Sequence, residues 1–280
     1  MMKPYDIYHV GISGGKDSAA TLLWAVHSSG WPREKIRATF CDTQNEHEFT
    51  YQYVKMLSDR VHPIETIRAD LGFYELAQKK KRFPSIRARF CTQYLKIFVT
   101  QKYIKAIQES GKSVLLVSGV RRNESLSRAE LPLFEYDEYY QADQFRPLLI
   151  WSLDDVWAFL ATFGISRNPL YEYGANRVGC FPCFNSTKHE IRTIAKHFPE
   201  RIDFIREQEG DTGHTFFARD KVPERFRSKE FVTEDGEVLY VPTIDDVVAW
   251  AKTPLYDRVG QYEMDFASPS VCNSNLGVCE

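Results

Sequence analysis

The chain has 280 residues, of which 43% are hydrophobic and 26% are charged, and its formal net charge is −2. This composition is typical of a globular chain that buries a substantial core, as one large domain or as a main domain with an appendage. The small net charge excludes a global field that would draw the chain onto nucleic acid or a membrane. Contact with a polyanion therefore requires a local patch.

The sequence also gives no sign of a membrane or secreted protein. No apolar run reaches the roughly 20 residues that span a bilayer, and residues 1–6 lead straight into a strand-like segment without a signal peptide. We expect a cytoplasmic protein with no membrane partner. In that setting a cysteine is more often a metal ligand, a nucleophile or a core residue than half of a disulfide.

Strands and helices alternate along the first part of the chain. The apolar patterns predict strands at 5–12, 36–42, 61–68 and 114–120, and helices at 16–29, 49–58 and 94–110. Continuous apolar strands between helices are typical of a parallel sheet covered on both faces. The expected fold class is therefore α/β, with a Rossmann-like parallel sheet flanked by helices.

The remainder of the chain is less regular. Ser152 and Thr243 each open a capping motif, and the helices that they begin are expected to end near Phe163 and Lys252. We expect a core domain at residues 1–146 and a smaller C-terminal part at 147–280 packed on it.

The most informative motif is Ser13-Gly14-Gly15-Lys16-Asp17-Ser18, between an apolar strand and a helix. Glycines let successive backbone N–H groups face one anion, and the helix N-terminus adds partial positive charge. Lys16 and the two serine hydroxyls can contact phosphate oxygens, whereas Asp17 would repel a bare phosphate and so suggests a bridging Mg²⁺. The alternative is an ordinary glycine-rich turn.

The loop resembles the SGGxDS pyrophosphate loop of the adenine-nucleotide α-hydrolase, or PP-loop, superfamily. Further segments are similar, in the same order, to the phosphoadenosine phosphosulfate reductase family. They are FCDTQNEH at 40–47, GVRRNESLSR at 119–128, RPLLIWS at 146–152, and NPLY at 168–171 followed by Gly174, Arg177, Gly179 and Cys180. The resemblance runs from about residue 5 to residue 183. It implies a PP-loop fold, and cleavage of ATP between the α and β phosphates with release of pyrophosphate.

Three arginines, Arg121, Arg122 and Arg128, follow the strand expected at 114–120. Ligands of open parallel sheets bind at the carboxyl ends of the strands, and guanidinium groups there can clamp sulfate or phosphate. Asp42 ends another strand on the same rim, where it binds Mg²⁺ or a ribose hydroxyl or caps the next helix. We expect Lys16, Asp17, Arg121 and Arg128 to be catalytic, and Ser13 to Ser18, Asp42, Gly119 and Arg122 to bind the nucleotide.

Cys180-Phe-Pro-Cys183 is a C-x-x-C pair, and Cys91 lies 89 positions before it. Iron–sulfur members of the resembled family carry Cys-Cys and then C-x-x-C at about this separation. Here Phe90 replaces one of those cysteines, so Cys272, or else Cys279, is expected to complete a [4Fe–4S] site. A Cys₄ zinc site and unliganded buried thiols are the alternatives. Cys41, inside a strand-like run, is interpreted as a core residue.

A basic stretch runs from Lys79 to Arg89 just before Cys91. It is either a solvated loop or a clamp for a polyanion, such as an outer phosphate of a nucleotide or a nucleic-acid backbone. The residues 212–227 have no assignment.

Two enzyme functions fit the sequence. The first is an ATP pyrophosphatase that activates a substrate for sulfur transfer, as in DNA phosphorothioation, with a sulfur donor protein such as a cysteine desulfurase as partner. The second is a reductase that converts adenylyl sulfate, or its 3′-phosphorylated form, to sulfite. The intact loop favours the first, because reductases of this family usually degrade it. The ending NLGVCE also departs from their C-terminal ECGLH. The non-enzyme alternative is a nucleotide-sensing or scaffold module.

Overall fold

The computed structural model describes residues 3–233 and 235–254 of the chain. Its main sheet has six strands in the order β3-β2-β1-β4-β6-β5. The first five strands in this order, which end with β6, run parallel. The sixth, β5, lies at the edge and pairs antiparallel with β6. Their bounds are β1 (Ile7–Ile12), β2 (Ile36–Asp42), β3 (Ile64–Arg68), β4 (Val114–Val117), β5 (Phe134–Asp137) and β6 (Ala142–Phe145).

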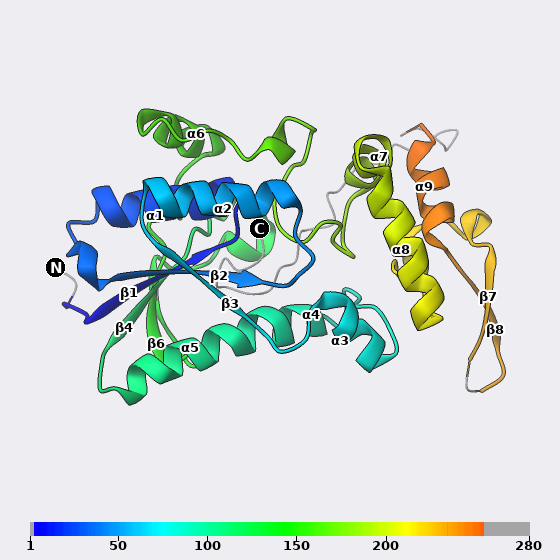
Figure 1. Ribbon diagram of the computed structural model, residues 1–280, viewed down its shortest axis with the longest axis horizontal. Helices are drawn as coiled ribbons and strands as arrows, with labels where there is room; N and C mark the ends of the chain where they lie inside the picture. Colours follow the sequence, from blue (N-terminus) through cyan, green and yellow to red (C-terminus); the bar gives the residue numbers. More distant parts are fainter. Residues whose placement is uncertain (1–2, 234, 255–280) are drawn as a thin grey trace.

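Helices cover both faces of this sheet (Figure 1). On one face lie α1 (Lys16–His27), α2 (Glu48–Arg60) and α6 (Leu153–Thr162), and their apolar side chains pack with Val10 and Ile12. On the other lies α5 (Phe98–Glu109), where Ile104 packs against Ile7, Val114 and Leu116. Neighbouring residues of β1 and β4 thus enter opposite cores, as the alternation of side chains along a strand requires.

A second helical layer lies beyond the carboxyl ends of the strands (Figure 1). It consists of α7 (Lys188–His197), α8 (Pro199–Thr212), α9 (Ile244–Lys252) and the hairpin of β7 (Lys229–Val232) and β8 (Val238–Val241). Its apolar core also includes α3 (Phe73–Lys80) and α4 (Phe90–Thr92), which come from the first part of the chain. A π-helical turn, η2 (Gln93–Ile97), joins α4 to α5.

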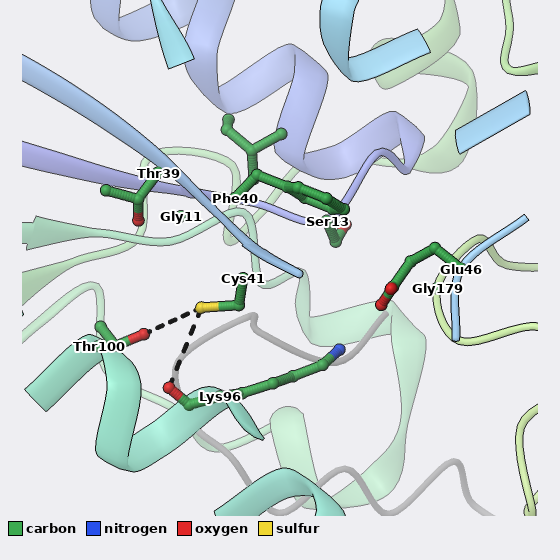
Figure 2. Close-up of a pocket in the computed structure, with 10 residues that line it drawn as sticks. Gly11, Ser13, Thr39, Phe40, Cys41, Glu46, Lys96, Thr100 and Gly179 are labelled. Atoms are coloured by element: carbon green, nitrogen blue, oxygen red, sulfur yellow. Dashed lines mark hydrogen bonds between the residues drawn. The ribbon is translucent and has the colours of Figure 1, made fainter. Parts of the chain in front are cut away.

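Six 3₁₀ turns connect these elements: η1 (Arg33–Lys35), η3 (Arg122–Glu124), η4 (Leu126–Arg128), η5 (Pro169–Tyr171), η6 (Arg219–Lys221) and η7 (Glu224–Phe226). A cavity of about 350 Å³, its open mouth included, lies at the carboxyl ends of β1 and β2 (Figure 2). Among the described residues, no helix is both long and apolar enough to cross a membrane.

The expected α/β fold with a mostly parallel sheet is confirmed, and the bounds of β2 match the expectation. The strand expected at 114–120 ends early, at Val117, because the backbone at Gly119 turns to pack against α1. The helix expected at 94–110 begins earlier, at Phe90. The strands β5 and β6, the hairpin, and the helices α3, α7 and α8 were not expected.

The boundary near Arg146 stays a prediction. Arg146 is fully buried and donates to the carbonyl of Pro132 at 2.8 Å. Leu148, Val156 and Leu160, just beyond it, belong to the same apolar core as α1.

Candidate nucleotide-binding site

The Ser13–Ser18 loop forms a closed turn between β1 and α1. Gly14 has φ +83°, and a Cβ there would lie 2.6 Å from Cγ2 of Thr50, so no side chain fits. The Ser13 and Ser18 hydroxyl oxygens lie 3.1 Å apart, and the Gly15 N–H donates to Oγ of Ser13 at 3.2 Å. Gly15, as the N-cap of α1, has no side chain to occupy the helix N-terminus. Turns of this kind at helix N-termini bind anions, and the expected phosphate contact of this loop stays a prediction.

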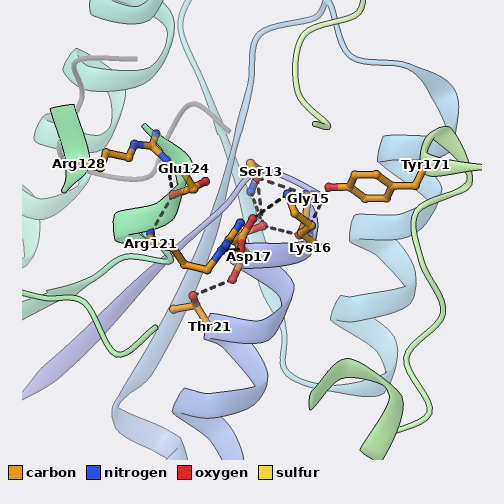
Figure 3. A network of polar contacts seen from close by, with 10 residues as sticks. Ser13, Gly15, Lys16, Asp17, Thr21, Arg121, Glu124, Arg128 and Tyr171 are labelled. Atoms are coloured by element: carbon orange, nitrogen blue, oxygen red, sulfur yellow. Dashed lines mark hydrogen bonds and ion pairs between the residues drawn. The ribbon is translucent and has the colours of Figure 1, made fainter. Parts of the chain in front are cut away.

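Asp17 lies under the loop and is fully buried. Its carboxylate pairs with Nζ of Lys16 at 2.9 Å and with Nε of Arg121 (Figure 3). Two cations from different segments thus neutralise one buried carboxylate, as a buried charge requires. The expected contact of Asp17 with Mg²⁺ stays a prediction; the contacts described here make Asp17 a residue that orients Lys16 and Arg121.

The three expected arginines do not all join this network. Arg128 is buried, and its guanidinium pairs with Glu124, whose carboxylate also accepts the backbone N–H of Arg121 at 2.8 Å (Figure 3). Arg122 is exposed, and its guanidinium donates to the carbonyl of Leu131 at 3.4 Å. The structure therefore brings Arg121 and Arg128 together through Glu124 and leaves Arg122 apart.

Two residues from a distant segment, 154 and 155 positions along the chain, contact the loop. The Lys16 N–H donates to the hydroxyl of Tyr171 at 3.1 Å, and Nζ of Lys16 lies 5.6 Å from the centre of the Tyr171 ring. Nδ2 of Asn168 donates to the carbonyl of Gly14 at 3.2 Å. The NPLY segment carried the family resemblance, but its residues were not among the expected site residues.

Gly119 has a steric role that the sequence did not reveal. A Cβ on it would lie 2.6 Å from Oγ1 of Thr21 and 2.8 Å from the carbonyl oxygen of Asp17. The segment after β4 therefore touches the first turn of α1 only because residue 119 has no side chain. That contact sets Arg121 beside Asp17.

The cavity beside the loop is lined by residues of β1, β2 and α5 (Figure 2). The thiol of Cys41 lies on its wall, 3.3 Å from Oγ1 of Thr100, so this residue is buried as expected but also borders the cavity. Asp42, at the end of β2, accepts from the Tyr51 hydroxyl and the Gln44 N–H, each at 2.8 Å. Asp42 thus holds the turn after β2, and its contact with Mg²⁺ or ribose stays a prediction.

The C-x-x-C loop docks on the turn that follows β2. Phe181 N–H donates to the carbonyl of Asn45 at 2.6 Å, and the Cys180 thiol lies 3.4 Å from Oγ1 of Thr43. Burial raises the pKa of Cys180 well above its usual range, and the nearby Lys96 ammonium partly opposes the rise. Burial also raises the pKa of Glu46, again opposed by Lys96. Both acids are thereby biased toward their neutral forms.

A second cavity, of about 550 Å³ including its open mouth, lies next to the first. Lys96 and Gly179 border both cavities, so the two meet at these residues. Cys91, Cys180 and Cys183 all lie on its wall, with the cationic Arg89 and Arg177 among the other lining residues.

The structure therefore brings the three expected cysteines to one cavity. Among residues 3–233 and 235–254, however, no three Cys, His, Asp or Glu side chains converge closely enough to hold a metal ion. The expected fourth ligand, Cys272 or Cys279, lies outside the described residues. The metal site stays a prediction.

Lys96 was missed by the sequence analysis, as was Glu46 as a site residue. Lys96 is 8% exposed and lies on the π-helical turn η2, and π turns recur at functional sites. The signal available in the sequence was a single lysine between apolar residues of an amphipathic helix.

Comparison with known proteins shows the family of the chain. A family model for the phosphoadenosine phosphosulfate reductase domain matches residues 8–186. The chain is 32% identical to an uncharacterized 37.8 kDa protein of Escherichia phage 186, over 97% of this chain and 96% of the phage protein. It is 34% identical to the adenosine 5′-phosphosulfate reductase of Neisseria meningitidis over 46% of this chain, and spans about half, 54%, of that enzyme.

Among solved structures, the phosphoadenylyl-sulfate reductase of Candida auris in its phosphate complex is similar with a TM-score of 0.49 and 17% identity, over 65% of this chain and 84% of that one. The family match covers more than half of the present chain, from β1 through the C-x-x-C loop. The chain belongs to the phosphoadenosine phosphosulfate reductase domain family.

Proposed function

We propose that the protein is an ATP pyrophosphatase that activates a substrate for sulfur transfer, with AMP and pyrophosphate as products. The observation that carries the proposal is the complete Ser13–Ser18 loop at the N-terminus of α1, with Lys16 held against it by Asp17 and Tyr171. A glycine-rich turn at a helix N-terminus, with a lysine beside it, suits the two linked phosphates of a pyrophosphate leaving group.

In the proposed reaction an oxygen of the acceptor attacks the α-phosphorus of ATP. The bond from that phosphorus to the bridging oxygen breaks, and the electron pair leaves with pyrophosphate. The sulfur of the donor then attacks the acceptor atom that carries the adenylylated oxygen, the bond from that atom to this oxygen breaks, and the oxygen leaves with AMP. The loop and Lys16 stabilise the charge that builds on the leaving group. Bound Mg²⁺ would add charge stabilisation on the phosphate oxygens.

The two cavities suit the other parts of the substrates. The cavity at the ends of β1 and β2 would hold the nucleoside, because it lies beside Ser13 and has Phe40 and Ile12 on its wall. Arg121 and Arg128 would hold an anionic acceptor, because both lie next to the loop (Figure 3). Holding both reactants in place lowers the entropic part of the barrier.

The second cavity would serve the sulfur step. Cys91, Cys180 and Cys183 have the donor chemistry of an iron–sulfur or zinc site, and the cations Lys96, Arg89 and Arg177 suit a thiolate-ligated, anionic group. These cysteines, with a tail cysteine, would hold the group, which would carry or organise sulfur delivered by a donor such as a cysteine desulfurase.

A reductase acting on adenylyl sulfate, or its 3′-phosphorylated form, is the second candidate. The observation that favours it is the similarity to several proteins named adenosine 5′-phosphosulfate reductase. Those matches cover 46% to 54% of this chain.

One pair of assays separates the two functions. Under anaerobic conditions, ATP labelled at the α-phosphate is incubated with the protein and with candidate acceptors added one at a time. Labelled AMP and free pyrophosphate support the proposal, and labelled ADP rules it out. Sulfite release from adenylyl sulfate and a thiol, without turnover of ATP, establishes the reductase instead.

A further inference from the structure

A third, open groove of about 910 Å³ lies away from the nucleotide loop. One wall is the turn at residues 85–87, and the other is formed by η6 and Arg227. Arg87, Arg219 and Arg227 all line this groove, with Asp220 as the one carboxylate among the described lining residues. Three guanidinium groups around a groove are a strong local concentration of positive charge in a chain of net charge −2.

Both walls are held in place by packing and hydrogen bonds. The turn at 85–87 closes on itself, since the Ser85 and Ala88 backbones bond in both directions at 3.1–3.2 Å. Phe83, just before it, packs on Phe216 with ring centres 5.1 Å apart. Nε of Arg227 donates to the carbonyl of Val222 at 3.2 Å. Both walls of the groove are therefore fixed by contacts within the fold.

The basic character extends beyond the groove. From Lys79 to Arg89 the sequence has six basic residues and no acidic residue, and the side chains at 79–82 are exposed. Within the described chain, no ion pair joins Arg87, Arg219 or Arg227 to a carboxylate. Their charge is thus available to an external anion.

The groove also lies beside the cysteine cavity. Arg89, two residues after Arg87, lines that cavity with Cys91. On the opposite wall Lys221, next to Asp220, donates to the carbonyl of Ser186, three residues after Cys183. The segments that line the groove thus lead, within a few residues along the chain, to the segments that carry the thiols.

We propose that this groove binds the phosphodiester backbone of a nucleic acid. The segment from Lys79 to Arg89, basic and without an acidic residue, faces Arg219 and Arg227 across the groove. Such a surface matches a polymer with one phosphate per nucleotide, and the guanidinium fork binds phosphate oxygens in pairs. Binding of the nucleic acid does not depend on the proposed function. Only the role of the bound nucleic acid, as the acceptor of sulfur, rests on it.

Binding is tested on the full-length, anaerobically purified protein, without ATP. Fluorescence anisotropy measures its affinity for labelled single-stranded and duplex 20-mers over a series of salt concentrations. Each lost phosphate contact lowers the slope of log K against log salt by about 0.7 for a single strand or 0.9 for a duplex, which is about a five- to eightfold loss at 0.1 M salt. We expect this loss in Arg219→Ala and in Arg87→Ala.

Two further variants sharpen the test. Asp220→Asn removes the carboxylate of the groove and is expected to tighten binding. Lys55→Ala removes an exposed positive charge on α2, paired with Asp59 at 2.8 Å, and is expected to leave the affinity unchanged. Arg227 is left intact because it supports the backbone at Val222.

Equal affinities in wild type, Arg219→Ala and Arg87→Ala would overturn the proposal, as would a loss in Lys55→Ala of the same size. Poly-glutamate serves as a second probe. If it binds as tightly as the oligonucleotides, and if the same variants weaken its binding, the partner is instead an acidic protein surface. Inorganic phosphate that binds in the groove while the oligonucleotides do not would also overturn it. Because no ATP is present, failure here is distinct from failure to release AMP.

Discussion

The phosphate loop and the cysteine cavity handle buried charge in opposite ways. At the loop, Asp17 is fully buried, yet Lys16 and Arg121 both contact its carboxylate. At the cysteine cavity, burial raises the pKa of Cys180 and of Glu46, and Lys96 only partly opposes it. The loop is thus charged and organised before any ligand arrives, whereas the thiol end is biased to stay neutral until a cation or substrate enters.

This difference separates what each end can do. A preorganised cationic loop stabilises developing negative charge without reorganisation during the reaction. A neutral, desolvated thiol is inert as a nucleophile until its proton leaves. We therefore propose that ATP is cleaved at the loop and that sulfur is handled at the cavity.

The largest expected effect is at the cysteine end. Cys180→Ser should remove essentially all bound iron and sulfide, because one thiolate ligand is lost from a site with few to spare. ATP binding should persist, since Cys180 lies outside the loop. Iron and sulfide analysis after anaerobic purification checks this, with Cys41→Ser as the matched control. Stoichiometric zinc without iron in the wild type would contradict the cluster.

On the sheet side, His9 gives the stability a pH dependence. Burial lowers the pKa of His9 from 6.5 to about 4, and its Nε2 lies 2.8 Å from Oγ1 of Thr39. A depressed pKa in the folded state means that unfolding takes up a proton below pH 6.5. The free energy of unfolding is therefore not lowered by His9 above pH 6.5. As the pH falls from 6.5 toward 4, the protonation of His9 in the unfolded chain lowers this free energy by about 3 kcal/mol.

Urea unfolding measured from pH 7 to pH 4 checks this, with His9→Gln as the comparison. The variant should show a shallower decline in the free energy of unfolding than the wild type. Parallel declines in the two proteins would show that other groups cause it.

A smaller effect is expected from a pair of glycine substitutions. Gly119→Ala places a Cβ 2.6 Å from Oγ1 of Thr21 and 2.8 Å from the backbone oxygen of Asp17, and should lower the free energy of unfolding by about 1–3 kcal/mol. Gly210→Ala, within α8, meets no described atom within 4 Å and should raise it by about 0.4–1 kcal/mol. Thermal unfolding measures both, and equal effects would refute the close approach at Gly119.

The phosphate loop could be predicted from the sequence because its six residues are contiguous and its strand–turn–helix context is local. The parallel sheet could be predicted because its buried strands are continuous apolar runs. Strands β5 and β6 could not, since FEYD and ADQF carry polar residues. β5 lies at the edge of the sheet, whereas β6 lies between β4 and β5 and buries Gln144.

The other parts of the site depend on contacts between distant segments. Tyr171 reaches Lys16 across 155 positions, and Gly119 meets Thr21 across 98 positions, so no local pattern reveals either contact. In the sequence, Lys96 is one polar residue in an amphipathic helix. Its position between two cavities depends on the π turn at η2 and on the docking of the C-x-x-C loop.

The central claim is that the Ser13–Ser18 loop holds the two outer phosphates of ATP. Its most direct test is calorimetric titration with AMP and with α,β-methylene ATP, which keeps the outer phosphates but resists cleavage. We expect the wild type to bind the ATP analogue about 10- to 100-fold more tightly than AMP, since charge-assisted contacts to the outer phosphates contribute about 1.5–3 kcal/mol. Lys16→Ala should lose most of that difference, whereas Lys55→Ala should keep it. AMP bound as tightly as the analogue, or a ratio unchanged by Lys16→Ala, would contradict the account.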